Sequence, residues 1–215
     1  DFAFFLEEVP GCYLLIGNGV ANQLMGGGGT DILEGGQGID TSLFKGTRGQ
    51  FHLTKTAPNC WSAQDTLGLE GIDLLHDVER LQFADKKLAL DLSPSEHAGQ
   101  SLEFLGVLAP AAINNPEIVG LILGLFDQGS SLHDVFQLAI DVHLVSQLAG
   151  SGSNTDLARL AFRNIVGAEA DATTLDILVS FMDGRSASYS QSDFLTVVAG
   201  MEVNQTHIGL IGWQQ

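Results

Sequence analysis

The sequence predicts an α+β fold in which short parallel strands come first and an all-α helical bundle follows. Three observations predict it. A nine-residue glycine-rich repeat fills residues 17–43, short alternating apolar segments fill residues 44–93, and helical periodicity runs from residue 94 to residue 215. We therefore divide the chain into a capping segment at 1–16, the repeat at 17–43, a capping β segment at 44–93 and a helical domain at 94–215.

Residues 17–43 consist of three consecutive nonapeptides. They read Gly17-Asn-Gly-Val-Ala-Asn-Gln-Leu-Met25, Gly26-Gly-Gly-Gly-Thr-Asp-Ile-Leu-Glu34 and Gly35-Gly-Gln-Gly-Ile-Asp-Thr-Ser-Leu43. The first six residues of each must turn sharply, which requires small residues and positive φ angles. The last three form a short strand whose central side chain, Leu24 or Leu33, points inward. The middle repeat matches G-G-x-G-x-D-x-U-x (U apolar) at every specified position, whereas Ser42 of the third stands where an apolar residue is usual.

This pattern resembles the calcium-binding β-roll repeat of RTX (hemolysin-type) proteins. The resemblance implies a short parallel β-roll with capping strands, in which backbone carbonyls and aspartates bind Ca²⁺, a hard cation that prefers oxygen ligands. On this resemblance the candidate metal-binding residues all lie in the turns. They are Gly17, Gly19, Asn22, Gly26, Gly28, Asp31, Gly35, Gly36, Gly38 and Asp40.

Successive turns of such a roll fall on alternate sides, so a complete calcium site needs two turns that are two repeats apart. This spacing pairs Asn22 with Asp40, and Asn22 lowers the ligand charge because it replaces an aspartate. Asp31 has no repeat two positions away in either direction. We therefore expect one well-formed calcium site and one half-built or rim site.

The first sixteen residues do not follow the repeat. Residues 1–19 resemble a short stretch near the C-terminus of hippurate-hydrolase-like amidohydrolases, without the metal ligands that such an enzyme needs. Within them, residues 12–16 predict one strand that caps the open end of the roll. Cys12 and Cys60 are the two cysteines of the chain, and so wide a spacing predicts neither a disulfide framework nor a zinc site.

Short alternating segments between turn residues predict a capping sheet in residues 44–93. The predicted strands are 51–54, 60–67, 79–83 and 88–92. The string from Gly71 to Asp85 resembles the segment that commonly follows RTX nonapeptides, which implies that it continues the sheet and covers the last apolar layer. Its acidic residues Asp73, Asp77, Glu79 and Asp85 fit no calcium-loop spacing, so we expect a solvated structural face there.

Ser93-Pro94-Ser95 marks the domain boundary, and Pro94 is predicted to start the first helix. Helix start and stop signals recur after this boundary. The predicted N-caps are Asn115, Ser131, Ser153, Asp171 and Ser190, and the predicted stops are Gly129, Gly167, Gly184 and Gly200. Residues 154–171 and 199–205 resemble the signature of a bacterial helical domain of unknown function that often lies beside RTX repeats. That resemblance implies a fold and no chemistry.

The formal net charge is −17, from 26 acidic and 9 basic residues, which argues against a nucleic acid or an anionic membrane as partner. It suits a protein that gathers divalent cations. The sequence contains no apolar run that could span a membrane and no visible N-terminal secretion signal. The RTX resemblance implies secretion through a type I apparatus, which uses an uncleaved C-terminal signal.

The sequence thus favours a secreted calcium-binding protein whose β-roll folds when it binds Ca²⁺ outside the cell. Two alternatives remain open: a calcium-dependent hydrolase of small amide, ester or lactone substrates, and a surface attachment module without catalysis. Residues 150–153, Gly-Ser-Gly-Ser, lack the spacing of a nucleophile elbow. The six histidines are scattered, so no catalytic residue is identified.

Overall fold

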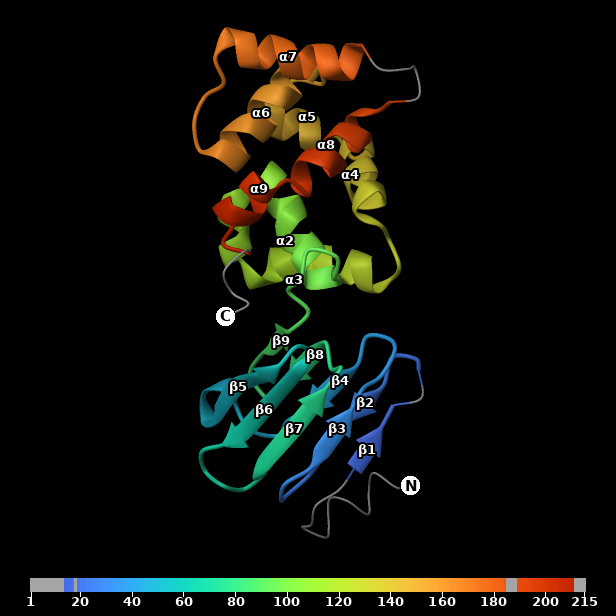
Figure 1. Cartoon of the computed structure of the whole chain (residues 1–215), viewed down its shortest axis with the longest axis vertical. Helices are drawn as coiled ribbons and strands as arrows, with labels where there is room; N and C mark the ends of the chain where they lie inside the picture. The colour runs from blue at the N-terminus through green and yellow to red at the C-terminus, as the bar shows by residue number, and fades with distance from the viewer. Residues whose placement is uncertain (1–13, 18, 185–188, 211–215) are drawn as a thin grey trace. The chain divides into compact units, whose positions relative to one another are not determined.

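The computed structural model describes residues 14–17, 19–184 and 189–210, and the chain divides into two compact units, residues 1–91 and 92–215 (Figure 1). The described residues form a mixed α/β structure. The first unit contains two small mixed sheets, and the second contains α-helices joined by short turns. Cys12 and the start of the predicted strand 12–16 lie outside the described residues.

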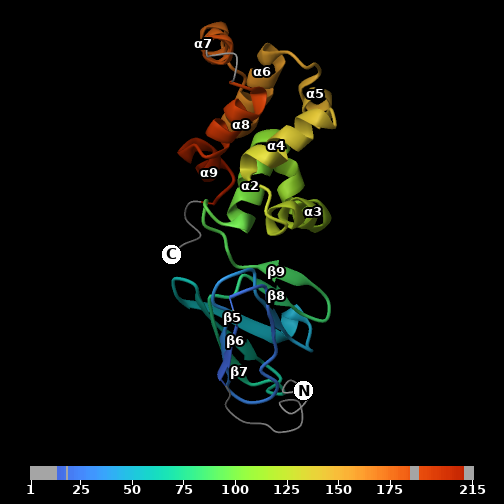
Figure 2. The same ribbon diagram turned by 90° about the vertical axis from the view of Figure 1, so that its right-hand side faces the viewer.

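The first unit builds its two sheets from short strands that alternate between them. The larger sheet has the order β1-β3-β7-β6-β5, and the smaller has the order β2-β4-β8-β9 (Figures 1 and 2). The strand bounds are β1 Leu14–Ile16, β2 Gln23–Leu24, β3 Ile32–Glu34, β4 Thr41–Leu43, β5 Phe51–Ala57, β6 Cys60–Asp65, β7 Ile72–His76, β8 Arg80–Gln82 and β9 Lys87–Ala89.

The nine-residue repeat explains this alternation, because each nonapeptide contributes one turn and one strand. β1, β3 and β7 are parallel neighbours in one sheet, and β2, β4 and β8 are parallel neighbours in the other. The antiparallel pair β5–β6 is inserted between β4 and β7 and extends the larger sheet. After this insertion β7 and β8 resume the alternation.

Inward-facing side chains of the two sheets form the core of the first unit. Leu33, Leu75 and Leu81 are fully buried at strand centres. Phe44, Phe51 and Phe83 form an aromatic cluster, with centroids of Phe44 and Phe83 5.1 Å apart in a stacked arrangement. Ser42 is also fully buried, at the strand position where the repeat usually has an apolar side chain.

The predicted strands of residues 44–93 correspond to β5, β6, β8 and β9, each with different bounds. β7 was not predicted as a separate strand. It lies at the centre of the larger sheet, where it pairs with β3 on one side and β6 on the other.

The helices of the second unit are α2 His97–Leu108, α3 Pro116–Asp127, α4 Leu132–Asp141, α5 Leu144–Ala149, α6 Asn154–Val166, α7 Ala172–Asp183, α8 Gln191–Ala199 and α9 Glu202–His207. All five predicted N-caps are confirmed, since each side chain accepts a hydrogen bond from a backbone N–H of the first turn. Pro94 does not begin a helix, because α2 begins at His97. None of the helices in the described ranges is long and apolar enough to cross a membrane.

Two asparagines of the helical signature hold α2 in place. The Asn164 side chain donates to the carbonyl oxygens of Val107 (2.7 Å) and Leu108 (3.1 Å) near the end of that helix. The buried Asn204 side chain donates to the carbonyl oxygens of Glu103 (3.1 Å) and Ala199 (2.8 Å). These side chains satisfy backbone carbonyls around the apolar core, so their role in this unit is structural.

We predict that Gly71→Ala destabilises the first unit more than Gly68→Ala. Both glycines have positive φ angles (81° and 76°), so each alanine carries a left-handed backbone penalty of about 1–2 kcal/mol. A Cβ at Gly71 would also overlap the carbonyl oxygen of Gly29, whereas a Cβ at Gly68 meets no atom within 4 Å. Urea unfolding in calcium-containing buffer should show the larger loss for Gly71→Ala. Equal losses would contradict the close stacking of the segments around Gly29 and Gly71.

Candidate metal centre

The connections between strands stack into two columns on opposite sides of the sheets. The first turn column consists of residues 19–22, 35–40 and 77–79, which follow β1, β3 and β7. Backbone hydrogen bonds join its levels: Thr41 N–H donates to the Asn22 carbonyl and Arg80 N–H to the Asp40 carbonyl, each at 2.9 Å. A Cβ on Gly35 would overlap the Asp77 carbonyl oxygen, so only glycine permits this stacking.

Acidic side chains follow the first turn column from level to level. Asn22 N–H donates to Asp40 Oδ1 at 2.7 Å, and Asp40 N–H donates to Glu79 Oε2 at 2.8 Å. Asn22 and Asp40 therefore lie side by side, as their spacing in the sequence predicts. Glu79 extends the column by one level, although no nine-residue spacing connects it with Asp40.

The second turn column consists of residues 26–31 and 69–73. Ile72 N–H donates to the Gly29 carbonyl at 3.0 Å, Leu74 N–H donates to the Asp31 carbonyl at 2.8 Å, and Asp31 N–H donates to Asp73 Oδ1 at 3.3 Å. The expectation that Asp31 has no counterpart two turns away was wrong. Because the β5–β6 hairpin is inserted, the counterpart lies 42 residues later in the chain instead of 18.

The expectation of a solvated acidic face at residues 73–85 was also wrong for Asp73, whose exposed fraction is 3%. Glu79 is partly buried through its contact with Asp40. Asp85 does remain exposed, and its carboxylate accepts the Arg48 N–H at 2.7 Å. The first two residues therefore belong to the turn columns, and Asp85 belongs to the surface.

The predicted metal-binding glycines serve the turns in two ways. Gly19, Gly36 and Gly38 adopt positive φ angles, of 82°, 84° and 121°. Gly17, Gly28 and Gly35 lie where a neighbouring turn comes close. Gly26 lies where its own turn closes, since a Cβ on it would stand 2.6 Å from Asp31 Oδ2. All the predicted glycines thus lie in the stacked turns, beside Asn22 and Asp40 in one column and Asp31 in the other.

Burial raises the pKa values of three carboxyl groups in the columns, those of Asp40, Asp73 and Glu79, and nearby negative charges add to the effect for Asp73 and Glu79. Burial, with the nearby Asp31 and Glu70 charges, raises the pKa of Asp73 to about 8. Burial, with the nearby Asp40 charge, raises the pKa of Glu79 to about 7. Burial also raises the pKa of Asp40, whose Oδ2 atom is buried and accepts no hydrogen bond from the described residues. At neutral pH Asp73 and Glu79 therefore favour either a bound proton or a neighbouring cation.

A pocket of about 450 Å³ opens beside the second turn column. Gly27, Gly28, Leu69 and Glu70 line it from the two stacked turns, and Lys45, Gly46, Gln50, Asp65 and Leu67 complete the lining. The Glu70 carboxylate accepts the backbone N–H groups of Lys45 (3.0 Å) and Gly46 (2.9 Å). The pocket therefore lies beside the glycine turns and the Glu70 carboxylate of the second column.

In the described ranges no group of three or more His, Cys, Asp and Glu side chains is arranged as a metal cluster. A cation in either column would therefore need backbone carbonyl oxygens in addition to the carboxylates.

The second unit contains a serine, a histidine and an aspartate in contact. Ser192 Oγ lies 3.0 Å from His133 Nε2, and Asp193 Oδ1 lies 3.3 Å from the same nitrogen. A hydrolytic triad requires the carboxylate and the nucleophile on different imidazole nitrogens. Ser192 is also fully buried. This cluster therefore does not have the geometry of a hydrolase triad.

Comparisons of the chain with protein-family models, with curated proteins and with solved structures found no match. What the turn columns do must be inferred from their own geometry and chemistry.

We predict that the metal-free first unit loses stability as the pH rises from 5 to about 8.5. The folded-state pKa values of Asp73 and Glu79 lie above the unfolded values of 3.8 and 4.5, so folding favours their protonated forms. The stability that these protons contribute is fully present below about pH 4 and is lost as the pH passes through about 7 to 8. Urea unfolding in the presence of a chelator measures this slope.

Asp73→Asn should flatten that slope, because the amide cannot ionise. A metal-free first unit that becomes more stable between pH 5 and pH 8.5 would contradict the assigned burial of these carboxylates.

Proposed function

We propose that the first unit is a calcium-binding β-roll of the RTX type, and that the protein is secreted and completes its folding on extracellular Ca²⁺. The observation that supports this most directly is the stacking of acidic side chains in two columns of glycine turns. Asn22, Asp40 and Glu79 form one column, and Asp31 and Asp73 form the other.

The donor set favours calcium over other common cations. Each column offers carboxylate oxygens beside flexible backbone carbonyls, and Ca²⁺ accepts six to eight such oxygens in irregular geometry. Mg²⁺ demands near-ideal octahedral geometry and keeps its waters. The columns offer neither thiolate nor imidazole, the donors that zinc prefers.

A bound cation also removes the electrostatic penalty of the columns. Asp73 is almost fully buried next to Asp31, and Asp40 is fully buried next to Glu79. Two carboxylates in contact away from water repel each other strongly, and a divalent ion between them replaces that repulsion with attraction. Calcium and protons should therefore compete for the same oxygens.

The proposed location follows from the calcium concentrations on the two sides of a cell envelope. Where calcium is scarce, the repeat would remain loose enough to pass through a type I secretion apparatus, which we include as a proposed partner. In millimolar calcium outside the cell the turns would close. Repulsion between the acidic side chains of the turns would keep the unliganded repeat open.

We predict that Asp73→Asn weakens calcium binding by about tenfold or more, equivalent to about 1.4 kcal/mol. The substitution replaces the buried carboxylate beside Asp31 with a neutral amide and preserves the side-chain size. Calorimetric titration with CaCl₂ measures the loss. Asp176→Asn is the matched control, because it makes the same charge change at an exposed position of α7 in the second unit.

The control variant should titrate like the wild type. Millimolar MgCl₂ should not replace CaCl₂ in raising the melting temperature. An unchanged affinity in Asp73→Asn, or equal stabilisation by the two ions, would rule out a specific site in the second column.

We predict that chelation opens residues 17–43 to proteolysis and leaves the second unit folded. Calcium that binds only the folded form stabilises it by about 2.7 kcal/mol at a hundredfold excess over Kd. The second unit has its own apolar core and helix caps, so it does not depend on the ion. Limited proteolysis with peptide mapping, and circular dichroism of the same samples, test both parts.

Cleavage should appear between Gly17 and Leu43 in chelator and disappear in calcium, with the helical signal unchanged. Equal resistance to cleavage in both conditions would show that calcium does not control folding of the repeat.

A further inference from the structure

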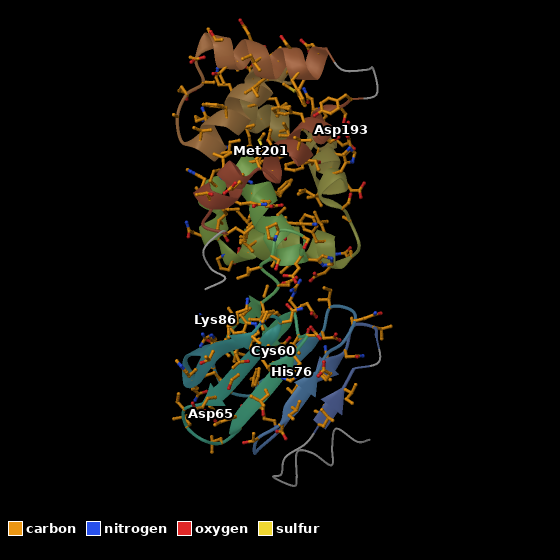
Figure 3. All side chains as sticks on the ribbon, viewed as in Figure 1. Cys60, Asp65, His76, Lys86, Asp193 and Met201 are labelled. Carbon is orange, nitrogen blue, oxygen red and sulfur yellow. The ribbon has the colours of Figure 1, made fainter. Side chains whose placement is uncertain are left out.

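The loop that joins β6 to β7 exposes two leucines at the pocket of the first unit. This β6–β7 loop (residues 66–71) follows Asp65, the last residue of β6 (Figure 3). Leu67 and Leu69 are 61% and 78% exposed, and Leu69 is the most exposed large apolar side chain in the part of the chain that the structure describes. Both leucines line the pocket of about 450 Å³, a volume in the range of ligand sites. The loop therefore presents apolar surface that the described residues leave uncovered.

Hydrogen bonds order the β6–β7 loop without any ligand. The Asp65 carboxylate accepts three backbone N–H groups of the loop at distances of 2.8 to 3.0 Å, those of Leu67, Leu69 and Glu70. The backbone N–H and the hydroxyl group of Thr66 both donate to the Gln50 carbonyl, at 2.8 Å and 2.7 Å. A loop that is ordered before binding loses little conformational entropy when a partner contacts it. The two leucines are thus already positioned for contact.

The charged groups of the pocket favour a cation. Asp65 and Glu70 line it with two carboxylates, and Lys45 contributes one positive charge. Burial would raise the pKa of Asp65, but its backbone hydrogen bonds lower the pKa below the ordinary value, so this carboxylate is charged at neutral pH. The Glu70 carboxylate accepts the N–H groups of Lys45 and Gly46. A carboxylate has about four acceptor positions, so Glu70 can accept a further donor.

We propose that this pocket is a docking site for a protein partner and binds one lysine or arginine side chain of that partner. The cationic group contacts Glu70, and apolar residues next to it in the partner cover Leu67 and Leu69. A free amine would occupy the pocket alone and leave both leucines exposed, whereas a peptide segment covers them. Gly27 and Gly28 have no side chains, so they leave room for the incoming side chain. The net charge of −17 also favours a basic partner over an acidic one.

The test measures the binding of labelled peptides to the full chain by fluorescence anisotropy, in millimolar calcium. One probe is a short peptide that alternates leucine with lysine, and its neutral counterpart has norleucine in place of each lysine. The lysine peptide should bind about tenfold more tightly than the norleucine peptide, and its affinity should fall as the salt concentration rises. Calorimetric titration of the same protein with CaCl₂ measures calcium binding separately, so that a failure of either proposal is recognised by itself.

Three substitutions test the individual contacts. Glu70→Gln removes the charge and keeps an oxygen that can accept the same two N–H groups, so it should weaken binding of the lysine peptide about tenfold and leave the norleucine peptide unchanged. Lys45→Gln removes the competing positive charge and should strengthen binding of the lysine peptide. Leu69→Ser should weaken binding of both peptides, because this exposed side chain contacts the partner.

Glu117→Gln is the matched control, because it makes the same charge change at an exposed position of α3 in the second unit, and it should bind both peptides like the wild type. The proposal is overturned if the lysine and norleucine peptides bind equally, or if folded Glu70→Gln binds the lysine peptide as tightly as the wild type. It is also overturned if hexylamine binds as tightly as the lysine peptide, since the pocket would then take a small amine. Thermal melting in calcium checks that each variant is folded, and the Leu69→Ser result stands independently if Glu70→Gln does not fold.

Discussion

Repulsion between stacked carboxylates is the constraint on which the first unit depends. The turns can stack only if Asp31 lies next to Asp73 and Asp40 lies next to Glu79, and burial raises the pKa values of Asp40, Asp73 and Glu79. Asp40, Asp73 and Glu79 each accept one backbone N–H through a carboxylate oxygen. A hydrogen bond from an amide does not cancel a full negative charge. The stability of the first unit therefore depends on positive charge, supplied either by protons or by a divalent cation.

The rest of the unit positions these columns. Glycines at the crossing points let one turn approach the carbonyls of the next, as Gly35 does against Asp77 and Gly71 against Gly29. The leucines and the aromatic cluster between the sheets keep the levels in register. A buried ion pair between Arg80 and Asp91 joins β8 to the segment after β9. The apolar core therefore supports the columns, and the stability of the turns themselves depends on the charge of their acidic side chains.

The parts of this structure that could be predicted from the sequence are those that local patterns determine. The nonapeptide period predicted the short strands and the proximity of Asn22 to Asp40, and cap residues such as Ser131 and Ser190 predicted where helices begin. The roles of Asp73 and Glu79 could not be predicted in this way, because the β5–β6 hairpin separates them from the repeats and breaks the nine-residue spacing. The sequence signal for these two residues is the turn-and-strand pattern that resumes after the hairpin, in β7 and β8.

A crystal structure of the full chain in calcium, with anomalous diffraction data that locate the ion, tests this account most directly. We expect anomalous density in the first turn column next to Asn22 and Asp40, and in the second column next to Asp31 and Asp73, with backbone carbonyls completing each coordination shell. Calcium bound only at scattered surface carboxylates, with both columns free of density at saturating calcium, would contradict it.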